Sequence, residues 1–170
     1  MKRPARKTKG RKPRPSARVK AQKPTASVVG VSSQASASSA SPPERPRLGL
    51  EASVEVVVPH EWTIQHFDAR LPAVLSTPAM IGMMEMAAAQ AVQPDLPPGA
   101  ITVGTRVEVD HLKAVTTGAN VRAQARLVGH EGRFLVFEVE AHSGHHQIGR
   151  GRVFRAVVEP AKFSAAAEKR

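Results

Sequence analysis

The pattern of apolar positions changes sharply near residue 48, and it predicts a folded domain only beyond that point. Residues 1–47 are rich in Lys, Arg and Pro at first and then in Ser and Ala, with few large apolar side chains. Such a segment buries too little apolar surface to offset the entropy lost when the chain is ordered. We therefore predict a disordered tail over 1–47, one domain over 48–160 and a short C-terminal tail over 161–170.

Residues 79–92 give the one clear helix signal within the domain. The segment is apolar on nearly every side, and Glu85 is its single charged residue. An almost uniformly apolar helix is buried on most of its surface. Its start is marked by Ser76 or Thr77, either of which can serve as the N-cap, and by Pro78 at the beginning of the helix.

The other apolar segments have the composition and alternation of β-strands. Before the helix, residues 53–58 predict a strand and residues 62–67 a short extended piece. After the helix, β-branched and alternating residues separated by turn signals predict strands at 101–115, 119–129, 134–141 and 147–158. The regular turns predict an antiparallel meander. One buried helix followed by antiparallel strands indicates an α+β fold in which a single sheet curls around the helix.

Positive charge is concentrated in the tail. The chain has 25 Lys and Arg residues against 14 Asp and Glu, and residues 1–50 hold 13 of the basic residues but one acid, Glu44. The domain is therefore near neutral, and its surface gives no indication of nucleic-acid binding. The tail fits a weak contact with a polyanion, such as nucleic acid or an acidic membrane surface. A solvated extension fits the tail better, because no aromatic residue is interleaved with the basic ones.

Several classes of protein are disfavoured by what the sequence lacks. It has no cysteine, which excludes disulfides, a thiol nucleophile and a cysteine-ligated zinc site. No apolar run approaches the roughly 20 residues that a membrane span requires. The basic N-terminus is not followed by the apolar stretch of a secretory signal. We therefore expect a cytoplasmic protein without a transmembrane segment.

Three residues are candidates for chemistry, and each has a structural alternative. Glu85 lies between two methionines in the apolar helix, where a buried carboxylate must be paired, hydrogen-bonded or protonated; alternatively it lies on a narrow exposed stripe. Thr77 is either an ordinary N-cap or a hydroxyl at the positive end of the helix dipole, where an oxyanion would be stabilised. His111 follows a strand and is either a general base or an ordinary strand residue.

The spacing of these candidates constrains how they can act together. Thr77 and Glu85 are separated by a rise of roughly 12 Å along a helix. Joint action therefore requires a bridging residue, an irregular helix start, or residues from two protomers. Gly104 within a predicted strand indicates close approach of a backbone or ligand. The histidines at 142, 145 and 146 have no recognised ligand spacing, so we predict no metal site.

The candidate residues lie in motifs that resemble the fluoroacetyl-CoA thioesterase family of hot-dog proteins. The stretch Val74–Glu85 has Thr77 at the helix entrance, Gly82 in the first turns and Glu85 eight residues after the threonine. Downstream, Val103–His111 is similar to the family's Gly-Thr strand ending in a histidine. The likeness extends over nearly the whole domain.

The resemblance implies a catalytic set of Thr77, His111 and Glu85 in a hot-dog fold. It also implies that Gly104 lies near the thioester, that Arg155 contacts coenzyme A, and that the site forms at the interface of a homodimer. The implied activity is hydrolysis of a short or medium acyl-CoA without a separate cofactor, because coenzyme A is part of the substrate. The alternative is a non-catalytic acyl-CoA-binding or regulatory module. A hot-dog dehydratase would require an Asp/His motif that the sequence does not contain.

Overall fold

The computed structural model describes residues 45–167, which form one antiparallel sheet, one long helix and one short helix. Strand β1 spans Glu51–Val57, helix α1 spans Thr77–Val92 and helix α2 spans Pro160–Ala167. The other strands are β2 (Ile101–His111), β3 (Asn120–Glu131), β4 (Phe134–Ser143) and β5 (His146–Val158). Three short 3-10 turns are η1 (His60–Trp62), η2 (Ile64–His66) and η3 (Gln93–Asp95).

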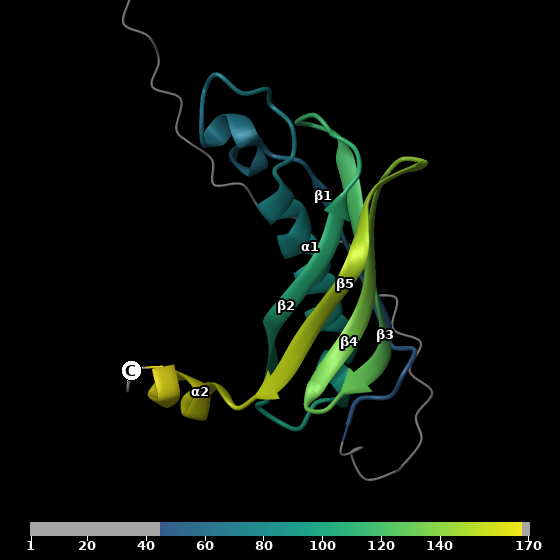
Figure 1. Cartoon of the computed structure of the whole chain (residues 1–170), viewed down its shortest axis with the longest axis vertical. Helices are drawn as coiled ribbons and strands as arrows, with labels where there is room; N and C mark the ends of the chain where they lie inside the picture. The colour runs from purple at the N-terminus through teal and green to yellow at the C-terminus, as the bar shows by residue number, and fades with distance from the viewer. Residues whose placement is uncertain (1–44, 168–170) are drawn as a thin grey trace, which may run out of the picture.

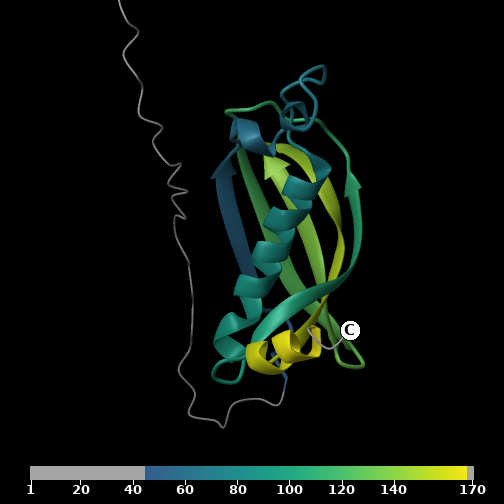
Figure 2. The same ribbon diagram turned by 90° about the vertical axis from the view of Figure 1, so that its left-hand side faces the viewer.

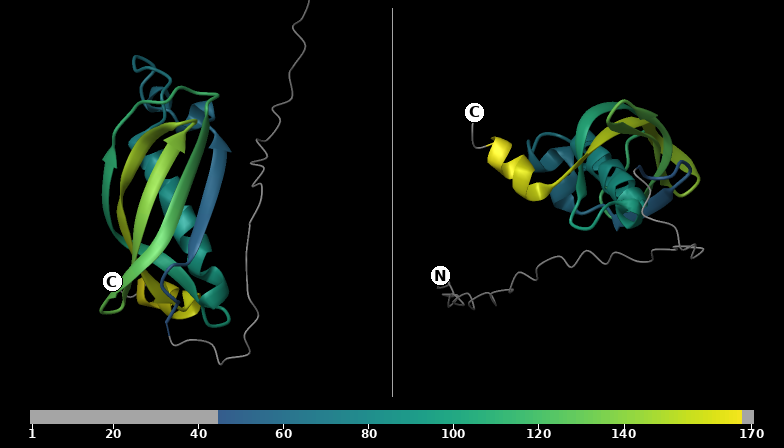
Figure 3. Two further views of the ribbon diagram at one scale, coloured as in Figure 1. Left: turned by 90° about the vertical axis from the view of Figure 1, so that its right-hand side faces the viewer. Right: turned by 90° about the horizontal axis from the view of Figure 1, so that it is seen from below.

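The five strands form one sheet in the order β1-β3-β4-β5-β2, and every neighbouring pair is antiparallel. Strands β1 and β2 are therefore the edges of the sheet. Helix α1 lies along one face of the sheet (Figures 1 and 2). Seen from below, the sheet curls around the helix (Figure 3). The predicted hot-dog arrangement of one sheet around one central helix is confirmed.

The core lies between α1 and the inner face of the sheet. Helix α1 contributes three buried methionines and a run of alanines to this core. Strand β3 alternates as the sequence predicts, with Val121 and Leu127 buried and Arg122 exposed. Gly149 of β5 leaves room for the Met80 side chain of α1, since a Cβ atom there would lie 2.6 Å from Cε of Met80. This packing fixes the first turns of α1 against the sheet.

The start of α1 resolves which residue caps it. The helix begins at Thr77, one residue before Pro78, which the sequence places at the first helical position. The buried Ser76 is the N-cap, and its Oγ accepts a hydrogen bond from the amide of Ala79 at 3.4 Å. Pro78 lies in the first turn, where its missing N–H costs no helical hydrogen bond. The hydroxyl of Thr77 is thus not required to cap the helix.

The predicted extended piece at residues 62–67 is wrong. This segment forms turns η1 and η2, and only Thr63 makes an isolated bridge, to Leu75. Local hydrogen bonds replace the strand ladder, because the amide of Thr63 donates to the carbonyl of His60 at 3.0 Å and that of Phe67 to Ile64 at 3.1 Å. The residue pattern alone did not distinguish these turns from a short strand.

The predicted meander is correct for β3, β4 and β5 but wrong for β2. Strand β2 pairs with β5 at the far edge and not with β3, its neighbour in sequence. The turn near Gly118 belongs to a crossover connection from β2 to β3 and not to a hairpin. Here the amide of Gly118 donates to the carbonyl of Val58 at 2.8 Å. A turn signal gives a change of direction but does not specify which strand is paired next.

The ends of the domain lie at residue 47 and in α2. Most of the predicted tail, residues 1–44, lies outside the described residues, and so do residues 168–170. Arg47 is described, and its Nε donates to Oδ2 of Asp95 at 3.0 Å. This hydrogen bond holds the pKa of the Asp95 carboxyl below its ordinary value.

Helix α2 occupies much of the segment 161–170, predicted as a C-terminal tail. Among residues 45–167, no helix has the length and apolar character needed to cross a membrane.

Candidate active site

Thr77 and His111 meet where the start of α1 faces the end of β2. Oγ1 of Thr77 lies 2.9 Å from Nδ1 of His111, within hydrogen-bonding distance. The two residues are 34 positions apart in sequence, and the packing of α1 against the sheet brings them together. Since Ser76 caps the helix, the Thr77 hydroxyl can donate to the imidazole. A hydroxyl hydrogen-bonded to an imidazole is the pairing that base-assisted acyl transfer requires.

Glu85 lies further along α1 and pairs with Arg155 of β5. Nη1 of Arg155 and Oε2 of Glu85 form a short ion pair, and the two side chains are 7% and 23% exposed. The same guanidinium is fixed by Thr102 of β2: Nε donates to Thr102 Oγ1 at 2.9 Å and Nη2 to the Thr102 carbonyl at 2.8 Å. Arg155, expected to contact coenzyme A, is therefore buried and engaged within the protein, where it holds the Glu85 carboxylate in place.

Gly104 of β2 lies directly against the carboxylate of Glu85. A Cβ atom at this position would lie 2.9 Å from Cδ and 3.0 Å from Oε1 of Glu85. The close approach expected from a glycine in a strand is thus to the Glu85 side chain. Any larger residue at position 104 would displace a carboxylate that Arg155 fixes from the other side.

The structure does not bring the three predicted residues together in one chain. Thr77 and His111 form one pair. Glu85 forms an ion pair with Arg155 and lies against Gly104, seven residues before His111 on β2. Seven residues of strand extend roughly 23 Å. Within residues 45–167, Oε1 of Glu85 and Nε2 of His111 are both buried and lack a hydrogen-bond partner. One is an acceptor and the other a donor when protonated, and buried polar groups of this kind are rarely left unpaired.

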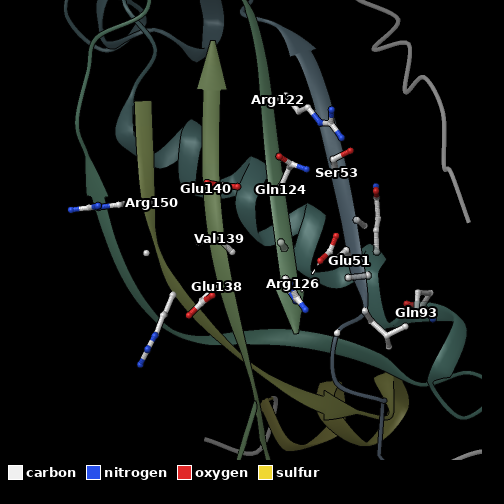
Figure 4. Close-up of a pocket in the computed structure, with 18 of the residues that line it drawn as sticks. Glu51, Ser53, Gln93, Arg122, Gln124, Arg126, Glu138, Val139, Glu140 and Arg150 are labelled. Carbon is white, nitrogen blue, oxygen red and sulfur yellow. Dashed lines mark ion pairs between the residues drawn. The ribbon is translucent and has the colours of Figure 1, made fainter. Parts of the chain in front are cut away.

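Two surface hollows differ in their relation to these residues. A small hollow of about 310 Å³ is lined by Thr77 and His111 together with apolar side chains and Lys113. A broad, open hollow of about 1270 Å³ lies over the outer face of the sheet and the β1 edge (Figure 4). Its lining alternates in charge, for example Glu51 beside Arg126 at 3.3 Å, and contains no histidine. The smaller hollow is therefore the candidate reaction site.

The histidine-rich turn between β4 and β5 makes only pairwise contacts. Nε2 of His142 lies 3.9 Å from Glu140, and Nδ1 of His146 lies 3.2 Å from Nζ of Lys113. Across the described part of the chain, no three potential ligands are grouped closely enough to hold a metal ion. The sequence analysis did not single out Lys113, which lines the smaller hollow, or Thr102, which holds Arg155. The position of Lys113, two residues after His111, was the one available signal for it.

This chain is similar to proteins described as thioesterases. A family model described as "Fluoroacetyl-CoA-specific thioesterase" matches residues 58–161. A fluoroacetyl-CoA thioesterase of Streptantibioticus cattleyicolor is 38% identical over 125 residues, which cover 70% of this chain and 90% of that protein. A solved fluoroacetyl-CoA thioesterase has a TM-score of 0.69 and 35% identity, covering 75% of this chain and 98% of the other. A Thermus thermophilus hypothetical protein of the thioesterase superfamily has a TM-score of 0.68 and 31% identity, covering 74% and 93%.

Proposed function

Because this chain belongs to the family of fluoroacetyl-CoA-specific thioesterases, we propose that it hydrolyses a short or medium acyl-CoA at Thr77 and His111. The chain is a thioester hydrolase by its family and fold. The observation that supports this particular site is the 2.9 Å contact between the Thr77 hydroxyl and the His111 imidazole beside a surface hollow.

The proposed reaction begins with His111 as general base. Nδ1 of His111 takes the proton of the Thr77 hydroxyl, and Thr77 Oγ1 attacks the thioester carbonyl carbon. The C–S bond breaks, and the coenzyme A thiolate leaves with the proton from His111. Water then hydrolyses the acyl-threonine ester with His111 as base again. In an alternative form of the reaction, Thr77 orients a water molecule. His111 deprotonates this water, which then attacks the thioester carbonyl carbon directly. In both, the positive end of the α1 dipole stabilises the oxyanion.

We assign Glu85 to the site of a second copy of the chain. The buried Nε2 of His111 requires an acceptor, and the buried Oε1 of Glu85 requires a donor. A carboxylate on the second imidazole nitrogen fixes the tautomer and stabilises the imidazolium that forms during proton transfer. Each copy would therefore supply what the other lacks, and a two-fold dimer would contain two such sites.

The edge strand β2 provides a route to this dimer. An antiparallel β2–β2 pairing centred between Val107 and Glu108 would place Gly104, with Glu85 against it, opposite His111 of the partner subunit. Two apolar side chains of β2 are exposed, Ile101 at 39% and Val107 at 41%, and they support burial of this edge against a partner. The same pairing would extend the sheet without a gap.

Arg155 is assigned a positioning role in this proposal. Its guanidinium is engaged by Glu85 and twice by Thr102, so the carboxylate is held with Oε2 paired and Oε1 available. A contact of Arg155 with coenzyme A stays a prediction, as do a cytoplasmic location, the lack of a separate cofactor and a polyanion contact by residues 1–47. Gly104 would lie near the thioester through its contact with Glu85.

The test is a thiol-release assay on the full chain with acetyl-, fluoroacetyl-, hexanoyl- and phenylacetyl-CoA, run beside His111→Ala. Turnover of any substrate that disappears in the folded variant supports the proposal and identifies the preferred acyl group. A folded wild-type protein that turns over none of them would favour a non-catalytic acyl-CoA-binding module. Unchanged turnover in His111→Ala would remove the proposed base.

A further inference from the structure

Among the residues that the structure describes, no carboxylate neutralises the positive charge of Lys113. Its Nζ lies 3.2 Å from Nδ1 of His146, and it forms no ion pair with an acidic residue among those the structure describes. An unneutralised cation next to an imidazole is suited to an anion from outside the protein.

The backbone fixes Lys113 and His146 relative to each other. The amides of Leu112 and Lys113 both donate to the carbonyl of Ile148, at 2.8 Å and 3.3 Å. His146 is the first residue of β5, two positions before Ile148. The main chain thus holds the two side chains side by side at the end of the sheet where β2 finishes. Strand pairing therefore brings the two residues close together, and their exposed side chains meet at Nζ and Nδ1.

This cationic pair adjoins the candidate reaction site. Lys113 lines the same hollow of about 310 Å³ as Thr77 and His111. It follows His111 by two residues, roughly 7 Å along an extended chain, and its side chain extends further to His146. The pair therefore lies to one side of Thr77 and His111, at the margin of the same hollow.

We propose that Lys113 and His146 bind a phosphate group of the coenzyme A portion of the substrate. This inference rests on the proposed thioesterase function and deepens it. Coenzyme A carries a diphosphate and a 3′-phosphate, and a lysine ammonium is a strong donor to phosphate oxygens. The imidazole of His146 supplies a second nitrogen to the same anion. The pair would distinguish coenzyme A thioesters from other thioesters with the same acyl group.

The test compares two substrates that share an acyl group and differ in phosphate. Hydrolysis of acetyl-CoA and of acetyl-N-acetylcysteamine, which has the thioester without phosphates, is measured for wild type, Lys113→Met and Lys113→Arg. In Lys113→Met we expect KM for acetyl-CoA to rise about tenfold, the scale of one charged hydrogen bond. We expect kcat/KM for the phosphate-free ester to be unchanged, and Lys113→Arg to restore most of the affinity. Arg122→Met, on the outer face of the sheet, is the matched control and should change neither.

Binding of free coenzyme A by calorimetry separates this inference from the proposed function. A weaker Kd in Lys113→Met supports the phosphate contact even if the protein turns over no substrate. Dephospho-coenzyme A tells the two phosphates apart: if its Kd is no longer affected by Lys113→Met, the 3′-phosphate is the one bound. An unchanged Kd and KM for Lys113→Met, or equal losses on both thioesters, would overturn the inference.

Discussion

The hydroxyl of Thr77 lies 2.9 Å from Nδ1 of His111, while the adjacent Ser76 caps helix α1. Two neighbouring hydroxyls at one helix terminus thus have different hydrogen-bond partners. Ser76 satisfies an amide of the first turn, and Thr77 is left to face the imidazole across the gap between α1 and β2. This division makes the structural and the chemical contributions of the helix start separable by substitution.

Thr77→Ala and Ser76→Ala should have opposite effects on activity and stability. Thr77→Ala removes the proposed nucleophile or water-orienting hydroxyl and should reduce kcat by about 100-fold or more, with little change in the melting temperature. Ser76→Ala removes the N-cap and should cost about 1 kcal/mol of stability while retaining activity in the folded protein. Thiol release and thermal unfolding measure the two effects. A fully active Thr77→Ala enzyme with a lowered melting temperature would assign the cap to Thr77 instead.

The sequence predicted the fold because its strongest signals are local. The apolar run of α1 and the alternation of β3 each determine an element without reference to the rest of the chain. The pairing of β2 with β5 could not be read in this way, since it depends on which strand reaches the far edge of the sheet. Likewise, the turns over 62–67 are set by backbone hydrogen bonds within the segment, which its residue types do not report.

The sequence singles out the candidate residues one by one, but it does not give the geometry in which they lie. Thr77, Glu85 and His111 each stand out by residue type and position. Nothing in their spacing indicates that Glu85 pairs with an arginine 70 positions away. The sequence contains many basic residues, and any of them could be the ion-pair partner of this carboxylate. The separation of Glu85 from His111 was anticipated only in part, through the length of helix between Thr77 and Glu85.

Gly104→Ala should damage activity more than stability. The new Cβ would lie 2.9 Å from Cδ of Glu85 and force the carboxylate to move, while the backbone of β2 has no positive φ that requires glycine at this position. Displacement of a catalytic group by about 1 Å can cost about 100-fold in rate. The matched control is Gly129→Ala in β3, where the nearest atom, Cβ of Val136, is at an ordinary 3.9 Å. Equal activity in the two variants, measured by thiol release, would show that the position of Glu85 is unimportant.

Arg155→Met should be strongly destabilising, unlike loss of a surface arginine. It would leave the carboxylate of Glu85 without its cation in a largely buried place, at a cost of about 3 kcal/mol in urea unfolding. Arg126→Met breaks a pair whose side chains are 62% and 59% exposed, and should cost less than about 1 kcal/mol. Adding Glu85→Gln to Arg155→Met should recover part of the loss, since the uncompensated charge is removed. If the two single variants lose the same stability, Arg155 does not hold Glu85 as the structure indicates.

Mixing two inactive variants should restore activity if the site is shared between subunits. A Glu85→Gln chain and a His111→Ala chain each lack one member, but a mixed dimer contains one complete site with His111 from one copy and Glu85 from the other. Random assortment of equal amounts makes half the dimers mixed, so about a quarter of wild-type activity should return after joint refolding. Thr77→Ala mixed with His111→Ala is the control: both changes fall in the half-site that a single copy supplies, and no activity should return. Recovery absent from both mixtures would place Glu85 and His111 in separate roles within one chain, and recovery in both would move Thr77 to the opposite half of the site from His111.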